Sequence, residues 1–139
     1  MGMVSPLGLD TDSTWQSLLA GKSGMDYITL FNAESYDTRF AAEVKGFDPT
    51  AYMERKEARR MDRFAQLAVA ASLQAVAQAV IEKGLVDSSD FAVIVGSGIG
   101  GLTTLSEQIQ VLLEKGPGRV SPFTTPMMIA DMAAAQISI

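Results

Sequence analysis

Residues 91 to 101 read Phe91-Ala-Val-Ile-Val-Gly-Ser-Gly-Ile-Gly-Gly101, five apolar residues followed by six that include four glycines. A short apolar run bounded by glycine predicts a strand buried on both faces, in a sheet covered by helices. A helical pattern follows from Leu102 to about Lys115. Glycines at the carboxyl end of such a strand let the backbone approach another group closely, at the edge where open α/β folds place ligands. That group could be a phosphate, an acyl chain or another stretch of backbone.

The composition removes several classes of function. The chain has 139 residues, of which 47% are hydrophobic, and a formal net charge of −5, which argues against general affinity for nucleic acid or an anionic membrane. The absence of cysteine and histidine excludes disulfides, thiolate zinc sites, cysteine nucleophiles and histidine bases. No apolar run approaches the ~20 residues that span a bilayer, and the N-terminus has no signal-peptide pattern. We therefore expect a cytoplasmic protein that binds neither nucleic acid nor membrane.

Both ends of the chain look cut. Residues 1–8 read like the exit from a strand, and residues 136–139 stop without a terminating signal. A chain of this length suits one domain or part of a larger one. We therefore expect residues 1–139 to be a piece of a larger α/β domain.

The remaining elements are predicted from local patterns. Ser13-Thr-Trp-Gln16 has the form of a capping box and predicts a helix that runs to Ala20. Asp10 and Asp12 beside it could belong to a metal site, but helix capping is the favoured interpretation. Residues 64–81 are apolar almost all round, which predicts a helix buried between layers. The other predictions are a loop over 24–37, a strand over 40–47, a turn or short helix opened by Asp48-Pro49, a helix end at 82–84, a turn over 86–90, an extended segment over 121–126 and a helix over 127–136.

Five of the eleven cationic residues fall within nine positions, which is a dense cluster for an acidic chain. On one helix they would form a single positive face. That face could be solvated and paired with Glu54, Glu57 and Asp62, or it could dock an acidic partner. Composition alone favours the solvated face. The basic cluster comprises Arg55, Lys56, Arg59, Arg60 and Arg63.

Two enzymatic interpretations of the glycine-rich turn have weak support. The dinucleotide-binding interpretation fits the local context, with a predicted strand before the turn and a helix after it, but not the wider context. Residues 96–101 fit the G-x-G-x-x-G pattern of dinucleotide-binding folds, yet no acidic residue closes a second strand about 20 residues later, where Ser121-Pro122 stands instead. Ser97 lies at a strand-to-helix turn, but Val95 breaks the G-x-S-x-G pattern and no histidine exists to take a proton. A serine hydrolase is set aside, and a dinucleotide site is a weak alternative.

Four segments of the chain carry a more specific signal. They are Gly2-Met-Val-Ser-Pro-Leu-Gly8, Arg55-Lys-Glu-Ala-Arg-Arg-Met-Asp62, Gly96-Ser-Gly-Ile-Gly-Gly-Leu102, and Arg119-Val-Ser-Pro-Phe123 through Gln136-Ile-Ser138. In order and separation they resemble the β-ketoacyl-[acyl-carrier-protein] synthase II family, the elongating condensing enzymes of dissociated bacterial fatty acid synthesis. The resemblance covers the whole chain, which looks like the N-terminal third of such an enzyme. It implies the thiolase-like fold, an α/β architecture of α/β/α/β/α layers with only part of the N-terminal half present, and a homodimer.

The resemblance implies a decarboxylative Claisen condensation. In the family a cysteine takes the growing acyl chain from acyl carrier protein, and two histidines assist decarboxylation of malonyl-carrier protein and stabilise the developing oxyanion. All three should lie beyond Ile139, so we expect no catalytic residue in this chain, no activity of the chain alone, and no cofactor or metal. The alternatives are a polyketide-type ketosynthase, its non-catalytic partner subunit, or a non-enzymatic binding module that uses the basic cluster.

The resemblance also assigns residues of an acyl pocket. Ile99 matches the family residue that gates the pocket near the nucleophile. Thr124 and Thr125 match positions that line its far end, reached across the dimer interface. The family usually has Phe followed by Val or Ile there, so two hydroxyls imply a smaller and more polar pocket end and leave the preferred acyl length open.

Lys56, Arg59 and Arg60 match the basic residues that dock the acidic carrier protein. For these residues the resemblance favours docking over the solvated-face interpretation. Asp131 and Ala135 stand where the family usually has Asn and Gly. The sequence does not indicate what these two differences do to the pocket or the fold.

Overall fold

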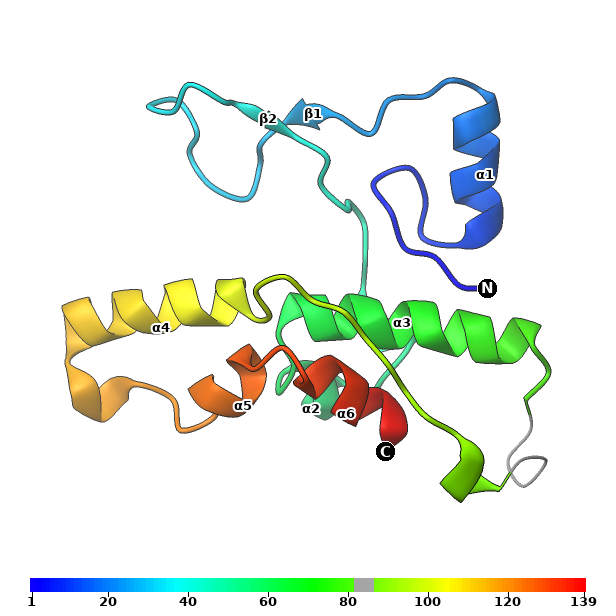
Figure 1. Cartoon of the computed structure of the whole chain (residues 1–139). Coiled ribbons are helices and arrows are strands. Elements are labelled where there is room, and N and C mark those ends of the chain that lie inside the picture. The colour runs from blue at the N-terminus through cyan, green and yellow to red at the C-terminus, as the bar shows by residue number, and fades with distance from the viewer. Residues whose placement is uncertain (82–86) are drawn as a thin grey trace.

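The computed structural model describes residues 1–81 and 87–139, which form a mixed α/β arrangement dominated by helices (Figure 1). Helix α3, Arg63–Gln78, lies at the centre, and α6, Met132–Ser138, packs along it. The β1–β2 hairpin and α1 lie on the other side of α3 from α6 (Figure 1). The other elements are α1 Thr11–Leu19, β1 Asp26–Tyr27, β2 Phe40–Ala41, η1 Pro49–Ala51, α2 Arg55–Ala58, η2 Ser88–Asp90, α4 Leu102–Lys115, η3 Pro117–Arg119 and α5 Thr124–Met128.

Helix α3 is buried along only part of its surface. Ala65 and Ala70 are buried, as is Ala133 of α6, whereas Leu73 is 46% exposed. The predicted helix is confirmed as far as Gln78, but burial on all sides is wrong for this structure, because the face that carries Leu73 stays open to solvent. The predicted helix end at 82–84 lies outside the described residues. None of the helices in the described part of the chain is long and apolar enough to cross a membrane.

The N-terminal segment lies directly on α3. A Cβ on Gly2 would stand 1.8 Å from the Ala71 carbonyl oxygen, so only glycine allows this approach. The Met3 N–H donates to Oε1 of Gln74 at 3.1 Å, and Nε2 of Gln74 donates to the Leu9 carbonyl at 2.8 Å. One amide side chain therefore holds both ends of the segment against α3.

The N-cap of α1 lies three residues before the predicted cap. Asp10 is the N-cap, and its Oδ1 accepts from the Ser13 N–H at 2.7 Å, so Ser13 occupies the third helical position. The capping box exists with Asp10 in the role that the sequence assigned to Ser13. These hydrogen bonds hold the pKa of Asp10 below its usual range. The capping interpretation is confirmed for Asp10. No group of three or more potential metal ligands occurs among the described residues.

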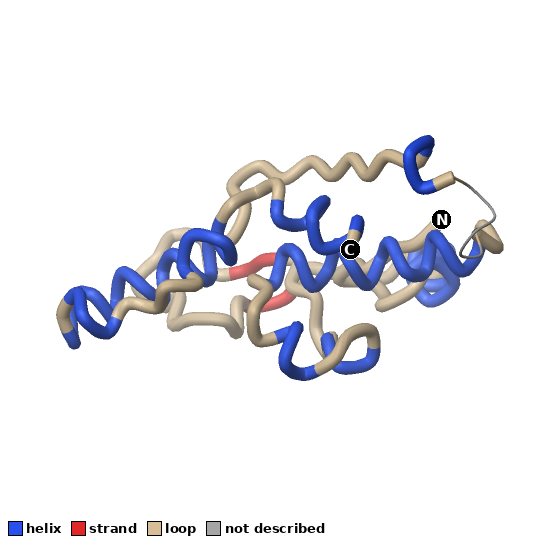
Figure 2. Tube along the Cα trace, turned by 90° about the horizontal axis from the view of Figure 1, so that it is seen from below, coloured by secondary structure: helices blue, strands red, loops and turns tan. Residues whose placement is uncertain are grey.

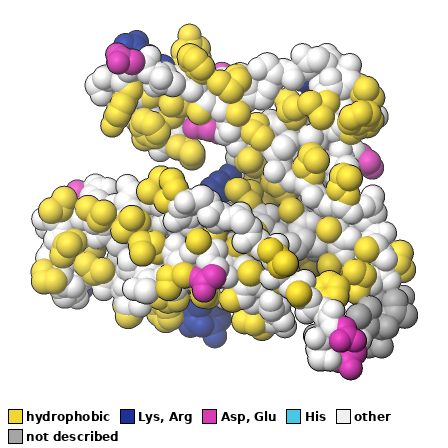
Figure 3. All heavy atoms as spheres, viewed as in Figure 1, with side chains coloured by type: hydrophobic (Ala, Val, Ile, Leu, Met, Phe, Trp, Pro, Cys, Tyr) yellow, Lys and Arg dark blue, Asp and Glu magenta, His cyan; other side chains and the backbone are white. Residues whose placement is uncertain are grey.

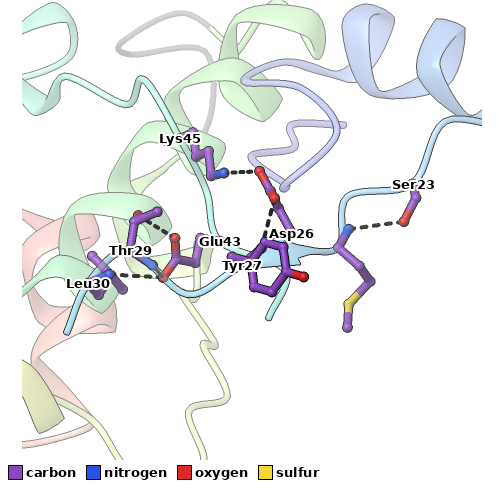
Figure 4. Close-up of polar contacts among 8 residues, drawn as sticks. Ser23, Asp26, Tyr27, Thr29, Leu30, Glu43 and Lys45 are labelled. Atoms are coloured by element: carbon purple, nitrogen blue, oxygen red, sulfur yellow. Dashed lines mark hydrogen bonds and ion pairs between the residues drawn. The ribbon is translucent and has the colours of Figure 1, made fainter. Parts of the chain in front are cut away.

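The only sheet among the described residues is a small antiparallel hairpin. Asp26 pairs with Ala41 and Tyr27 with Phe40, so the strand predicted over 40–47 is confirmed for its first two residues alone. Side chains bind the rest of this region together (Figure 4). Nζ of Lys45 lies 2.5 Å from Oδ2 of Asp26, and the Glu43 carboxylate accepts from the Thr29 hydroxyl at 2.7 Å and the Thr29 N–H at 3.0 Å.

These hairpin contacts should weaken in acid. The Thr29 hydroxyl and N–H hold the pKa of Glu43 below its ordinary 4.5, and the hydrogen bond from Lys45 holds the pKa of Asp26 below 3.8. Because both folded values are lower than the unfolded ones, the stabilisation is complete above pH 4.5 and is lost as the pH falls through the folded values. Amide chemical shifts of Thr29 in the intact protein, followed with pH, should report a Glu43 midpoint below 4.5 that vanishes in Glu43→Gln. A midpoint at or above that value would contradict the contact.

The segment at residues 91–95 is extended but is not a strand. Figure 2 shows it crossing the molecule as loop, and no described residue pairs with it. Ile94 is 92% exposed and Phe91 is 49% exposed. The prediction of a buried strand is therefore wrong for this structure, because an extended segment becomes a buried strand only where neighbours supply hydrogen bonds and cover. The helix predicted after it is confirmed as α4, with the predicted limits.

The C-terminal region folds as two helices where the sequence predicted one. Ile129 has φ −62° and ψ 131°, which separates α5 from α6 within the helix predicted over 127–136. The segment 121–126, predicted to be extended, turns instead. The Thr124 N–H and hydroxyl both donate to the Ser121 carbonyl, at 3.1 and 2.6 Å, and Pro126 then occupies the first turn of α5. Local side-chain hydrogen bonding outweighs the extended preference of residues that precede proline.

Candidate functional site

The glycine-rich turn packs against the last residues of α5 and the segment that joins α5 to α6, together called the α5–α6 connection (residues 127–131). Gly100 has φ +79°, and a Cβ there would lie 2.4 Å from the Met128 carbonyl oxygen. A Cβ on Gly101 would lie 2.5 Å from the Met127 carbonyl oxygen, and the Gly101 N–H donates to the Met128 carbonyl at 2.8 Å. The last two glycines are therefore required for contact with another stretch of backbone, one of the three possibilities that the sequence left open. Nothing lies within 4 Å of a Cβ built on Gly96 or Gly98.

The start of α4 already holds an anionic group of the protein. The Thr104 N–H donates to Oδ2 of Asp62 at 2.6 Å, in a buried contact. A dinucleotide site would offer these first N–H groups of the helix to pyrophosphate. Ser97, considered as a nucleophile, accepts from the Gly100 N–H at 2.9 Å and stabilises the turn instead. Both observations argue against the two enzymatic alternatives considered for this turn.

The residues assigned to an acyl pocket come from two elements that the fold brings together. Ile99 precedes the glycines that contact the α5–α6 connection, and its side chain is 70% exposed. Thr124 begins α5 half-buried, with its hydroxyl bound to Ser121, and Thr125 follows it exposed. The structure therefore joins the turn of Ile99 to the helix of Thr124 and Thr125 through backbone contacts.

The basic cluster does not form a single helical face. Helix α2 ends at Ala58, whose carbonyl accepts from Nε2 of Gln66 at 2.8 Å, and a turn separates α2 from α3. Arg63 belongs to α3, donates to the Val44 carbonyl at 2.7 Å and lies 5.5 Å over the ring of Phe47. The prediction of one continuous positive face is therefore wrong, because capping by Gln66 and Asp62 breaks the helix between residues 58 and 63. Arg63 has a structural role.

The carboxylates expected to neutralise the cluster are used elsewhere. Glu57 accepts from the Glu54 N–H at 3.2 Å, and Asp62 is buried against helix N–H groups. Within residues 1–81 and 87–139, the one ion pair joins Lys45 and Asp26. The remaining members of the cluster are exposed without an ionic partner among the described residues: Arg55, Lys56, Arg59 and Arg60.

Two residues of this region make contacts that the sequence did not predict. The guanidinium of Arg60 lies 5.4 Å from the centre of the Phe123 ring, at the start of α5. Asp62 was considered only as an ion-pair partner, but it is the N-cap of α3. Its position before the apolar helical run is a capping signal that sequence inspection can find. Its bond to Thr104, 42 positions away, leaves no local signal.

The arrangement as a whole identifies a class of protein. A solved structure described as the ishigamide ketosynthase/chain length factor matches 99% of this chain with a TM-score of 0.82 and 26% sequence identity, over 34% of its own length. The chain therefore has part of the ketosynthase fold, the thiolase-like α/β class that the sequence predicted. Its described residues supply helices and one short hairpin of that fold.

The sequence comparisons narrow the class to a family. The family described as "Beta-ketoacyl synthase, N-terminal domain" matches residues 1–139, and the chain belongs to this family. Proteins named 3-oxoacyl-[acyl-carrier-protein] synthase 2 from Synechocystis sp. and from Vibrio cholerae are each 45% identical to it over all 139 residues. The chain spans about a third of the length of these relatives, 33% and 34% respectively.

Proposed function

We propose that the protein carrying this segment is an elongating β-ketoacyl-[acyl-carrier-protein] synthase of fatty acid biosynthesis, an acyltransferase of the cytoplasm that works as a homodimer. The observation that carries the proposal is 45% identity to 3-oxoacyl-[acyl-carrier-protein] synthase 2 proteins over every residue of the chain. The polyketide alternative has weaker support, because the solved structure described as a type II PKS acyl-carrier protein in complex with its ketosynthase is only 17% identical. In this proposal residues 1–139 form part of the N-terminal ketosynthase domain.

The proposed reaction divides between this segment and the rest of the protein. A thiolate takes the acyl group from the phosphopantetheine of the carrier protein, so one thioester bond breaks as another forms. Loss of CO₂ from the malonyl group leaves an enolate carbon, which attacks the acyl thioester and expels the thiolate. Because this chain has neither cysteine nor histidine, the thiolate and its two assisting imidazoles come from outside it in this proposal. Decarboxylation supplies the carbanion, so the reaction as proposed requires no cofactor or metal.

This segment supplies binding surfaces in the proposed enzyme. Ile99 gates the acyl chain, and Thr124 and Thr125 line the far end of the pocket in the partner subunit. The backbone contacts of Gly100 and Gly101 with the α5–α6 connection support the proposal, since they fix these residues on one rigid unit. The two hydroxyls give a pocket end that is smaller and more polar than the family's usual Phe and Val or Ile.

The proposed docking surface for acyl carrier protein consists of Lys56, Arg59 and Arg60. Their exposure and the absence of ionic partners among the described residues support this role, since neutralised cations would attract an acidic partner less. Arg60 has a second contact, with Phe123, so we assign the purely electrostatic role to Lys56 and Arg59.

A chimera tests the proposed function. Residues 1–139 replace the matching segment of the Synechocystis relative, and the purified protein receives acyl-carrier proteins of several chain lengths together with malonyl-carrier protein. We expect CO₂ release and a β-ketoacyl product extended by the malonyl-derived unit, detected by mass spectrometry. The unaltered relative is the positive control, and the 139-residue chain alone should give no product. A chimera that melts cooperatively as a dimer but releases no CO₂ would refute the proposal.

A further inference from the structure

The carboxylate of Asp62 lies between the N-termini of two helices. Its side chain is nearly inaccessible, with 4% of the residue exposed. Oδ1 accepts from the Phe64 N–H of α3 at 3.3 Å, and Oδ2 accepts from the Thr104 N–H of α4 at 2.6 Å. The N-termini of two helices therefore share one buried carboxylate as a hydrogen-bond acceptor.

Helix α4 depends on this distant residue for its cap. Its N-cap is Gly101, which has no side chain to accept a hydrogen bond, and no acidic residue stands in its first turn. The Gly101 N–H is bound to the Met128 carbonyl. Asp62 therefore supplies to α4 the acceptor that an Asp or Ser at the cap position supplies to most helices.

Asp62 also touches the turn that carries Ile99. A Cβ on Gly101 would lie 3.1 Å from Cβ of Asp62 and 2.8 Å from Cα of Met128. The start of α4, the N-cap of α3 and the α5–α6 connection thus meet around one glycine with no room for a methyl group. Displacement of the carboxylate would release the end of the turn immediately after Ile99.

The same short segment reaches the proposed docking surface. Arg60 stands two residues before Asp62, and its guanidinium lies over Phe123, the N-cap of α5. We propose that Asp62 is a positioning residue of the acyl pocket. This inference rests on the proposed function, which gives Ile99 and Thr124 their roles in that pocket. By capping α3 and α4 together, Asp62 links the carrier-docking segment to the turn of Ile99 and holds that turn in place for long acyl chains.

Asp62→Ser in the chimera separates the two bonds of this carboxylate. Serine caps a helix about as well as aspartate, so the bond to Phe64 remains, whereas its single short oxygen leaves Thr104 without an acceptor. We expect kcat/KM for transfer of long acyl chains to fall about tenfold, as loss of a charge-assisted hydrogen bond implies. Transfer of an acetyl group should be unchanged, because so short a chain does not have to pass the gate that Ile99 forms in the proposed function. Asp48→Ser, which alters the exposed N-cap of η1, is the matched control and should change neither.

Two outcomes would overturn the proposal. One is a folded Asp62→Ser chimera in which long and short chains are affected equally, which would indicate general destabilisation. The other needs no variant: hydrogen exchange in the unsubstituted chimera should show the Thr104 amide protected together with that of Phe64, and rapid exchange at Thr104 would remove the basis of the proposal. The exchange measurement uses the unsubstituted chimera, so it tests the proposal even if the Asp62→Ser variant does not fold. It also separates the inference from the proposed function, which fails if the unsubstituted chimera releases no CO₂.

Discussion

Reversing the charges of Lys56 and Arg59 to glutamate should weaken binding of acyl carrier protein to the chimera by about tenfold to hundredfold at low salt. Both side chains are exposed, and neither forms an ion pair with a described residue, so both cationic groups are available to a partner. Each reversal replaces attraction to an acidic partner by repulsion. The effect should appear mainly in the association rate, measured by stopped flow or surface plasmon resonance, and should fade as salt is raised.

The matched control reverses Lys22 and Lys115, which are also exposed and which change the net charge of the chain equally. That variant should lose little affinity, because its charges lie at the end of α1 and the end of α4 and not on α2. Arg60 is left unchanged in both variants, since its contact with Phe123 would confound docking with the packing of α5. Equal losses of affinity in the two variants would show that only the net charge of the chain matters. Unchanged affinity in both variants would exclude docking at this surface.

The 139-residue chain alone should show no cooperative thermal transition as a monomer. A folded monomer of 14.8 kDa exposes about 7,000 Å² of surface, whereas this chain exposes 9914 Å². Its buried apolar residues are mainly alanines, with Val69 and Phe47, while Ile94 and Leu113 are 92% and 80% exposed. Figure 3 shows hydrophobic side chains spread over α4 and over the hairpin. So little buried apolar surface cannot offset the conformational entropy of the chain.

Scanning calorimetry and tryptophan fluorescence of Trp15 test this expectation. The isolated chain should melt gradually, or associate through its exposed apolar surface, whereas the chimera should melt in a single sharp transition. The unaltered Synechocystis relative provides the reference melt. A sharp transition of the isolated chain at a concentration where ultracentrifugation shows a monomer would prove the expectation wrong.

The helices were largely predictable because their signals are local. The apolar run of α3, the amphipathic pattern of α4 and the stop at Gly21 after α1 depend on residues within a few positions of one another. Helix starts were less accurate, as the shift from Ser13 to Asp10 shows. Both residues are good caps, and the choice between them depends on contacts such as that of the Ser17 hydroxyl with the Leu7 carbonyl, at 3.0 Å, which fix where α1 lies.

The predictions that failed required knowledge of neighbours. The apolar run at 91–95 has the residues of a buried strand but no described partner, and the helix predicted over 127–136 breaks at Ile129, where the backbone meets Gly100 and Gly101. The basic cluster does not lie on a single helical face, because Gln66, eight positions after Ala58, caps the end of α2. In each case a contact from another element decided the outcome.

By itself the sequence determined the family, the helical segments, the lack of any cysteine or histidine, and the glycines that a close approach requires. Only the tertiary structure decided what those glycines approach and which carboxylate caps α4. The physical reason is distance along the chain: a capping pattern or a hydrophobic period is written in adjacent residues, whereas the bond from Thr104 to Asp62 depends on how two helices are packed. The same packing brings the turn of Ile99 against the helix of Thr124 and Thr125.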